Sequence, residues 1–131
     1  MNKKIMPETK IYVGLNDAEV KKQLFDTEMY VSILKKVCCN YKVPFSFVLQ
    51  QGGYLHENGE YTEENSIVIS MINVKKELIT EIAKDLCVMF RQESVMVTEE
   101  PVVTYFISET LNDNDTRERS GDSAYKRRKD N

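Results

Sequence analysis

Residues 45–72 read FSFVLQQGGYLHENGEYTEENSIVISMI, and this stretch decides the expected fold. The Asn-Gly pair at 58–59 stands between two runs of β-forming residues, which is the strongest short-range signal for a β-hairpin. We therefore expect strands at 45–55 and 61–72, joined by a tight turn. The second run ends in IVISMI, a pattern typical of a largely buried strand.

A strand and a helix are expected on the N-terminal side of the hairpin. Residues 10–15 are rich in β-forming side chains and precede an Asn-Asp turn signal, which predicts a strand. Apolar residues then recur at helical spacing over 27–42, with Asp26 in a suitable N-cap position. Pro44 ends this helix, because the residue before a proline is pushed out of the α region.

A second helix is expected at 74–91, with Asn73 as its N-cap. Two short strands are expected after it, at 94–98 and 102–108, on either side of a Glu-Glu-Pro sequence. One face of the helix carries an apolar stripe. The stripe consists of Leu78, Ile79, Ile82, Ala83, Leu86 and Phe90.

The expected order is therefore β-α-β-β-α-β-β, the split βαβ pattern of ferredoxin-like or related folds. The sequence predicts an α+β domain over 1–108, with two helices on one face of a mainly antiparallel sheet. Residues 109–131 are charged and almost free of large aliphatic side chains. Such a segment cannot bury enough apolar surface to offset its ordering entropy, so a disordered tail is expected.

Charge and hydropathy limit the classes of partner. The net charge is −3, and the only basic cluster is Lys126–Lys129. Duplex nucleic acid is bound mainly through clustered Lys and Arg, so it is not an expected partner. The N-terminus has no apolar stretch of the signal-peptide kind, and the apolar run at 67–72 is too short to span a bilayer. A cytoplasmic protein with no membrane partner is expected.

Residues typical of catalysis or metal binding are scarce. His56 is the single histidine, which excludes a two-histidine metal site within one chain. The cysteine pair at 38–39 falls in an expected helix and His56 at a hairpin tip, so a Cys-His nucleophile is not expected. The acidic pairs at 63–64 and 99–100 are interpreted as solvated strand ends. The sequence therefore predicts no enzyme, no metal and no cofactor.

Two features favour binding of a small ligand. Gly52 and Gly53 lie inside a strand, which marks either a β-bulge or a place where a ligand approaches the backbone closely. Tyr54 and the glutamines at 50–51 beside them offer aromatic and amide groups. The second feature is the polar run RQES at 91–94, although an arginine at a helix C-terminus is also favoured by the helix dipole.

Four segments of the chain also resemble a known group of small phage and bacterial proteins. They are KIYVGLND at 10–17, GGYLHENG at 52–59, ENSIVISM at 64–71 and FRQESVMV at 90–97. The group is similar to a domain family of unknown function and includes the phage Thoeris anti-defence one family. The resemblance covers about residues 10–107.

This resemblance implies a function and a set of site residues. Thoeris anti-defence one proteins are non-enzymatic sponges that assemble as homodimers or trimers of dimers. They hold cyclic ADP-ribose isomers, and some hold cyclic oligonucleotides at a separate site. The positions that match the motifs are Gly52, Gly53, Tyr54, His56, Phe90, Arg91, Gln92 and Ser94.

Basic side chains that contact phosphates in that family have no fixed counterparts here. Lys35 or Lys36 fits the first such role, and Arg117 or Arg119 fits the second. Arg91 stands where the family often has asparagine, which leaves the identity of the ligand open.

Three functional hypotheses follow, and the expected ligand is a cyclic nucleotide. A sponge requires a concave, partly aromatic pocket with convergent Arg or Lys. A protein-interaction module that docks on a host protein requires a flat apolar patch instead. A small hydrolase requires clustered titratable groups, which are scarce. Because 102–108 is rich in β-forming residues, we expect a second subunit to cover this edge in a homo-oligomer.

Overall fold

The computed structural model describes residues 2–109. Its contacts place Ile5–Val103 in one compact unit, and the other described residues, 2–4 and 104–109, belong to a second unit. Within the described part of the second unit, the Lys3 ammonium lies 5.6 Å from the centre of the Tyr105 ring. The expected tail lies outside the described residues except for Glu109, and so do Arg117 and Arg119.

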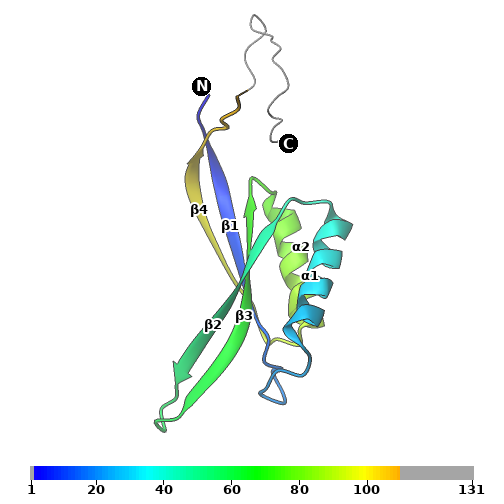
Figure 1. Ribbon diagram of the computed structural model, residues 1–131, viewed down its shortest axis with the longest axis vertical. Coiled ribbons are helices and arrows are strands. Elements are labelled where there is room, and N and C mark those ends of the chain that lie inside the picture. The colour runs from blue at the N-terminus through cyan, green and yellow to red at the C-terminus, as the bar shows by residue number, and fades with distance from the viewer. Residues whose placement is uncertain (1, 110–131) are drawn as a thin grey trace, which may run out of the picture. The chain divides into compact units, whose positions relative to one another are not determined.

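The elements follow the order βαββαβ and form an α+β fold of the ferredoxin-like type. Both helices lie on one face of a four-stranded antiparallel sheet whose strand order is β2-β3-β1-β4 (Figure 1). The fold class expected from the sequence is confirmed. The elements are β1 (Lys4–Gly14), α1 (Thr27–Tyr41), β2 (Ser46–Leu55), β3 (Tyr61–Ile72), α2 (Lys76–Met89) and β4 (Met96–Thr104).

The predicted hairpin is present with a regular register. β2 and β3 pair without interruption from Ser46 opposite Ser70 to Leu55 opposite Tyr61. Gly59 has a φ of 89°, as the Asn-Gly turn requires. The two glycines of β2 lie opposite Glu64 and Glu63 in an unbroken ladder, so the interpretation of this pair as a β-bulge is wrong.

Two sequence-based expectations about strands need correction. The two short strands expected after the second helix are one strand, β4, which runs through Pro101. β4 is an edge strand, where one side of the backbone needs no ladder partner, and a proline is tolerated there. β1 also begins earlier than expected, at Lys4 rather than at 10, and it pairs with β3 from Glu8 onward.

The start of the second helix also differs from the prediction. Asn73 is not its N-cap; it has a φ of 61°, and its N–H donates to the carbonyl of Pro7 at 2.8 Å. The helix begins at Lys76, with Lys75 in the N-cap position and no side-chain cap. Asn73 therefore turns the chain after β3 and ties that turn to β1, a role for which asparagine's tolerance of positive φ is suited.

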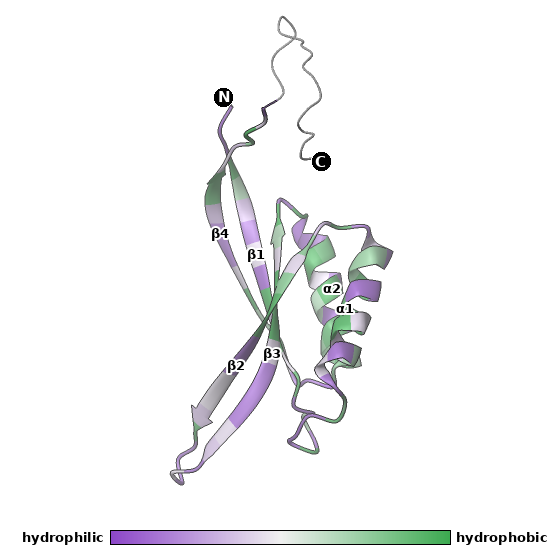
Figure 2. Cartoon of the chain, in the orientation of Figure 1, coloured by the Kyte–Doolittle hydropathy of each residue, from purple (hydrophilic) through white to green (hydrophobic). Residues whose placement is uncertain are grey.

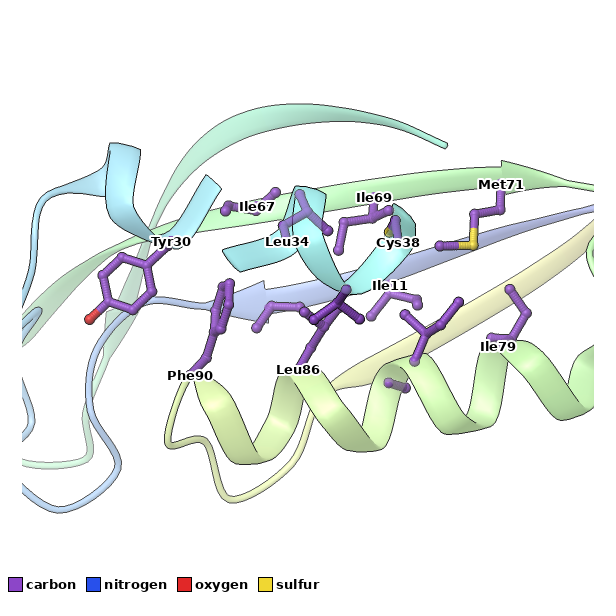
Figure 3. Close-up of a cluster of buried hydrophobic side chains, with 14 of the residues drawn as sticks. Ile11, Tyr30, Leu34, Cys38, Ile67, Ile69, Met71, Ile79, Leu86 and Phe90 are labelled. Carbon is purple, nitrogen blue, oxygen red and sulfur yellow. The ribbon is translucent and has the colours of Figure 1, made fainter. Parts of the chain in front are cut away.

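The core lies between the helices and one face of the sheet, and Figure 3 shows its members in contact. Ile11, Ile67 and Ile69 come from the sheet, and all three are fully buried. The predicted stripe of the second helix packs on them and is confirmed as core at Ile79, Ile82, Ala83, Leu86 and Phe90. No helix within residues 2–109 is long and apolar enough to cross a membrane.

Candidate functional site

Polar groups from four segments meet where β1 ends. The Glu64 carboxylate on β3 accepts hydrogen bonds from the Asn16 backbone N–H at 3.0 Å and from the Tyr54 hydroxyl at 3.2 Å. The Gln92 side-chain amide donates to the Asn16 carbonyl at 2.7 Å. We call this group, Asn16, Tyr54, Glu64 and Gln92, the acidic site. It joins the end of β1, the β2–β3 hairpin and the segment before β4.

The acidic site lies on the sheet face that the helices leave uncovered. Side chains alternate between the faces of a strand, and the buried Ile67 and Ile69 point toward the helices. Glu64 is therefore on the opposite face, together with Tyr54, because its pairing partner is Gly52. The part of β3 that carries Glu64 is hydrophilic (Figure 2).

Two glycines shape the space around the Glu64 carboxylate. A Cβ atom on Gly14 would lie 2.3 Å from Glu64 Oε2, so a side chain at position 14 would displace the carboxylate. At Gly52, a Cβ atom would meet nothing within 4 Å, so the backbone there is open to an approaching ligand. The free space beside Gly52 is compatible with its sequence-based interpretation as a point where a ligand approaches the backbone.

The electrostatics of the acidic site favour a cation. Among residues 2–109, no Lys or Arg forms an ion pair with Glu64. The pKa of Tyr54 is raised above its ordinary value of 10.0, first by the negative charge of Glu64, then by partial burial of Tyr54, and then by the hydrogen bond between the two side chains. Tyr54 consequently stays a neutral hydrogen-bond donor at neutral pH, and Glu64 is a carboxylate with no fixed countercharge.

Arg91, which the resemblance assigns to a ligand, is held by two carboxylates. Its Nε donates to Asp17 Oδ2, and its terminal amino group lies 3.2 Å from Glu19 Oε1. Asp17 is buried, and its Oδ1 also accepts the backbone N–H groups of Glu19 and Val20, both at 2.8 Å. A phosphate that binds Arg91 would have to compete with this pair of carboxylates.

The Asp17–Arg91 ion pair lies next to the acidic site in the chain and restrains two of its residues. Asp17 follows Asn16 in the chain, and Arg91 precedes Gln92. The ion pair therefore restrains both partners of the hydrogen bond from the Gln92 amide to the Asn16 carbonyl. The Arg91 carbonyl also accepts the Ala18 N–H at 2.9 Å. The hydrogen bond from Arg91 is the largest of several effects that lower the pKa of Asp17 from 3.8 to about 2.

Replacing Asp17 by asparagine should lower stability in a pH-dependent way. A carboxyl group whose pKa is lower in the folded state stabilises the fold above its unfolded pKa of 3.8, and that contribution disappears as the pH falls through about 2. The variant should therefore unfold at a lower temperature than the wild type at pH 7, and the difference should shrink between pH 4 and pH 2. Thermal unfolding followed by circular dichroism at several pH values measures this difference.

Asp26 provides the matched control for that experiment. It is exposed, and its side chain makes no capping hydrogen bond to α1. The Asp26→Asn variant should unfold at the wild-type temperature at every pH tested. Equal behaviour of the two variants would contradict the role assigned to Asp17.

The other residues expected from the sequence are dispersed. His56 lies at the hairpin turn, where its Nε2 is 2.7 Å from Thr62 Oγ1. Phe90 is 2% exposed and packs edge-on against Tyr30 in the core. Ser94 is exposed just before β4, and Lys35 is exposed on α1. None of these side chains makes a hydrogen bond or ion pair with the acidic site among residues 2–109.

Sequence reasoning missed two members of the site. Glu64 was interpreted as part of a solvated strand end, but it is half-buried and accepts two hydrogen bonds. The signal was available, because the Asn58-Gly59 turn fixes a register in which Glu64 faces Gly52. Asn16 was interpreted only as a turn residue. It contacts the site through its backbone N–H and carbonyl, and a residue type in the sequence does not indicate such backbone contacts.

Comparison with known proteins gives a family and a set of similar structures. The model of a family described as a protein of unknown function, DUF3574, matches residues 8–106. A phage SAM lyase in complex with S-methyl-5'-thioadenosine is 25% identical over 82% of this chain and 93% of its own, with a TM-score of 0.56. A phage SAM lyase in the apo state is 27% identical over 81% and 92%, with a TM-score of 0.54.

A structure of the Bacillus subtilis GlnK–ATP complex is 16% identical over 73% of this chain and 82% of its own, with a TM-score of 0.48. No curated protein matches the chain by sequence. The family match spans most of the chain, including all four segments that form the acidic site. The chain therefore belongs to the DUF3574 family of proteins of unknown function.

Proposed function

We propose that the acidic site binds a cationic adenine nucleoside of the S-adenosylmethionine class and that the chain cleaves this ligand as a lyase. The similarity to phage SAM lyase, which extends over most of both chains, is the observation that carries the proposal. It departs from the sequence-based expectation that the chain is not an enzyme, and the assay described below decides between the two.

The charge of the ligand supports this choice. S-adenosylmethionine carries a sulfonium, an α-ammonium and an α-carboxylate group and no phosphate, so its net charge is positive and its sulfonium is the cation that Glu64 would attract. Two unit charges 4 Å apart attract by about 1 kcal/mol in water and about 4 kcal/mol at the effective dielectric constant near a protein surface. Glu64, which has no cationic partner among the described residues, offers this attraction to a cation and repels a phosphate.

The surroundings of Glu64 support a nucleoside ligand. Tyr54 is exposed on the same face of the sheet, and aromatic rings provide the apolar surface on which an adenine or a ribose packs. A Cβ atom added at Gly52 would meet nothing within 4 Å, and Gly52 pairs with Glu64 on the strand face that also carries Tyr54. A ligand placed over Gly52 would therefore have both the Tyr54 ring and the Glu64 carboxylate beside it.

The chemistry of cleavage fits the same site. When the substrate's own carboxylate oxygen attacks the carbon attached to the sulfonium sulfur, a C–O bond closes a homoserine lactone as the C–S bond breaks. The electron pair of the broken bond stays on sulfur, and neutral S-methyl-5'-thioadenosine remains. That molecule is present in one of the phage SAM lyase structures. Because the product has lost the positive charge, Glu64 attracts the substrate more strongly than the thioether, which favours release of the product.

The second candidate is a non-enzymatic sponge for a cyclic nucleotide, as the resemblance to the Thoeris anti-defence one family implies. The observation in its favour is that all four matching segments supply contacts of one site, through Asn16, Tyr54, Glu64 and Gln92. A cyclic ADP-ribose would need Arg91 to exchange its two carboxylates for a phosphate. For this reason we rank the sponge second.

Calorimetry and chromatography on one sample separate the candidates. The purified chain is titrated with S-adenosylmethionine, S-methyl-5'-thioadenosine and cyclic ADP-ribose at low salt. The lyase proposal predicts tighter binding of S-adenosylmethionine than of the thioether, and chromatography should show thioether accumulating with time. Binding of cyclic ADP-ribose alone would favour the sponge. If none of the three binds to folded protein, the remaining hypothesis is a protein-interaction module.

A further inference from the structure

A cleft lies beside the start of α1, on the face of the β2–β3 hairpin opposite the acidic site. Its volume is about 510 Å³, which lies within the range of small-molecule sites. Asn65 follows Glu64 on β3, and consecutive side chains of a strand point to opposite faces, so the cleft and the acidic site are separate. The cleft is lined by Gln23, Leu24, Phe25, Asp26, Met29 and Asn65.

Three large apolar side chains of the cleft are exposed to solvent. Leu24 is 40% exposed, Phe25 is 51% exposed and Met29 is 49% exposed. The Phe25 ring contacts the core residue Tyr30 edge-on, with 6.0 Å between the ring centroids, so one side of the Phe25 ring is anchored. Exposed apolar side chains that gather in a cleft are typical of ligand sites, and aromatic rings and thioethers pack well against another aromatic ring. This wall therefore suits a planar ring.

Hydrogen bonds between amide side chains hold the cleft in shape. The Gln51 Nε2 donates to Asn65 Oδ1 at 3.3 Å, and Asn65 Nδ2 donates to Gln23 Oε1 at 2.9 Å. The Gln23 Nε2 in turn donates to the Phe25 carbonyl at 2.8 Å and to the Thr27 hydroxyl at 3.1 Å. These bonds tie the segment before α1 to the hairpin. A ligand then meets walls that are already in place, which lowers the ordering cost of binding.

Asp26 places a negative charge at the cleft. It is the N-cap residue of α1, yet its side chain makes no capping hydrogen bond, and the Met29 N–H donates to its backbone carbonyl at 3.0 Å. Asp26 is exposed, and none of the Lys and Arg side chains in residues 2–109 forms an ion pair with it. An ammonium group offers such a carboxylate a charge-assisted hydrogen bond, which is about twice as strong as a neutral one.

We propose that this cleft binds a small aromatic amine, with its ring against Phe25 and Met29 and its ammonium group on Asp26. The apolar wall and the carboxylate line one cleft, and they match the two parts of such a molecule. A purely apolar ligand would leave the charge of Asp26 unused, and an anionic ligand would be repelled by it. The site shares no residue with the acidic site, so it does not depend on the function proposed there.

Indole derivatives that differ only in their polar group test this assignment. The chain has no tryptophan, so the fluorescence of an indole probe reports its binding. Tryptamine carries an ammonium group, tryptophol a neutral hydroxyl and indole-3-propionate a carboxylate. Tryptamine should bind at least about 5-fold more tightly than tryptophol, which corresponds to about 1 kcal/mol for two unit charges 4 Å apart in water, and indole-3-propionate should bind most weakly. Equal affinities, or no saturable binding of tryptamine, would overturn the proposal.

Variants of the chain locate the bound amine. Asp26→Asn removes the charge at nearly constant size and should abolish the preference for tryptamine. Glu28→Gln is the matched control, because it removes the same charge from an exposed residue of the first turn of α1 that does not line the cleft. Met29→Ser should weaken all three probes, whereas Met89→Ser, at a residue that is 50% exposed on α2 and outside the cleft, should not. A preference that survives Asp26→Asn but disappears in Glu64→Gln would place the amine in the acidic site and contradict the proposal.

Discussion

Replacing Glu64 by glutamine should weaken the binding of S-adenosylmethionine by between about 5-fold and about 1,000-fold. This range corresponds to the loss of one charge pair of about 1–4 kcal/mol at 4 Å. Glutamine has the same size as glutamate but offers one acceptor oxygen where the carboxylate offers two. Its amide oxygen can keep the hydrogen bond from the Asn16 N–H, and its NH2 group can donate to the Tyr54 hydroxyl oxygen, so the substitution removes mainly the charge. Calorimetry at low salt measures the affinity, and cleavage of the ligand should fall with it.

Two further variants show whether the charge or the hydrogen bonding of Glu64 matters. Glu63→Gln removes the same charge from the neighbouring residue, which is exposed and points to the other face of the sheet, and should leave affinity nearly unchanged. Tyr54→Phe removes a hydrogen bond but no charge, so its effect should be smaller than that of Glu64→Gln. If S-adenosylmethionine bound the Glu64→Gln variant as tightly as the wild type, the proposed cation site would be wrong.

The fold was predictable wherever local signals agree with the tertiary structure. The Asn58-Gly59 turn fixed the β2–β3 register, and helical spacing of apolar residues identified both helices to within a few residues. The failures occurred where a distant contact overrides a local pattern. Asn73 has the composition of an N-cap, but it adopts a positive φ and bonds to Pro7 instead. Pro101 resembles a strand break but is tolerated at the sheet edge.

The candidate site was predictable only in part, because its contacts join residues far apart in the sequence. Tyr54 and Gln92 were expected, and they are linked through Glu64 and the backbone of Asn16. A sequence does not show that the Asn16 carbonyl lies beside residue 92. The role of Arg91 was equally hidden, because its carboxylate partners Asp17 and Glu19 are more than 70 residues away.

Replacing Phe90 by alanine should lower the free energy of unfolding by about 3–5 kcal/mol, the range for a buried aromatic residue truncated to alanine. Phe90 is 2% exposed at the end of α2, and its ring contacts Tyr30 edge-on with 5.1 Å between centroids. Figure 3 shows the ring between Tyr30 and Leu86. A natural domain is stable by only about 5–15 kcal/mol, so much of that margin would be lost. Urea denaturation of wild type and variant at pH 7 measures the difference.

The same variant also separates two roles for Phe90. The resemblance to a nucleotide sponge implies that this residue contacts a ligand, and in that case truncation would reduce affinity while stability stayed near that of the wild type. If Phe90 is a core residue instead, its truncation should lower the free energy of unfolding. Binding then suffers only because Arg91 and Gln92, which follow directly, lose their anchor. Val88→Ala, at an exposed position two residues earlier in α2, should change stability by no more than about 0.5 kcal/mol. An unchanged urea midpoint for Phe90→Ala together with lost affinity would return Phe90 to the binding site.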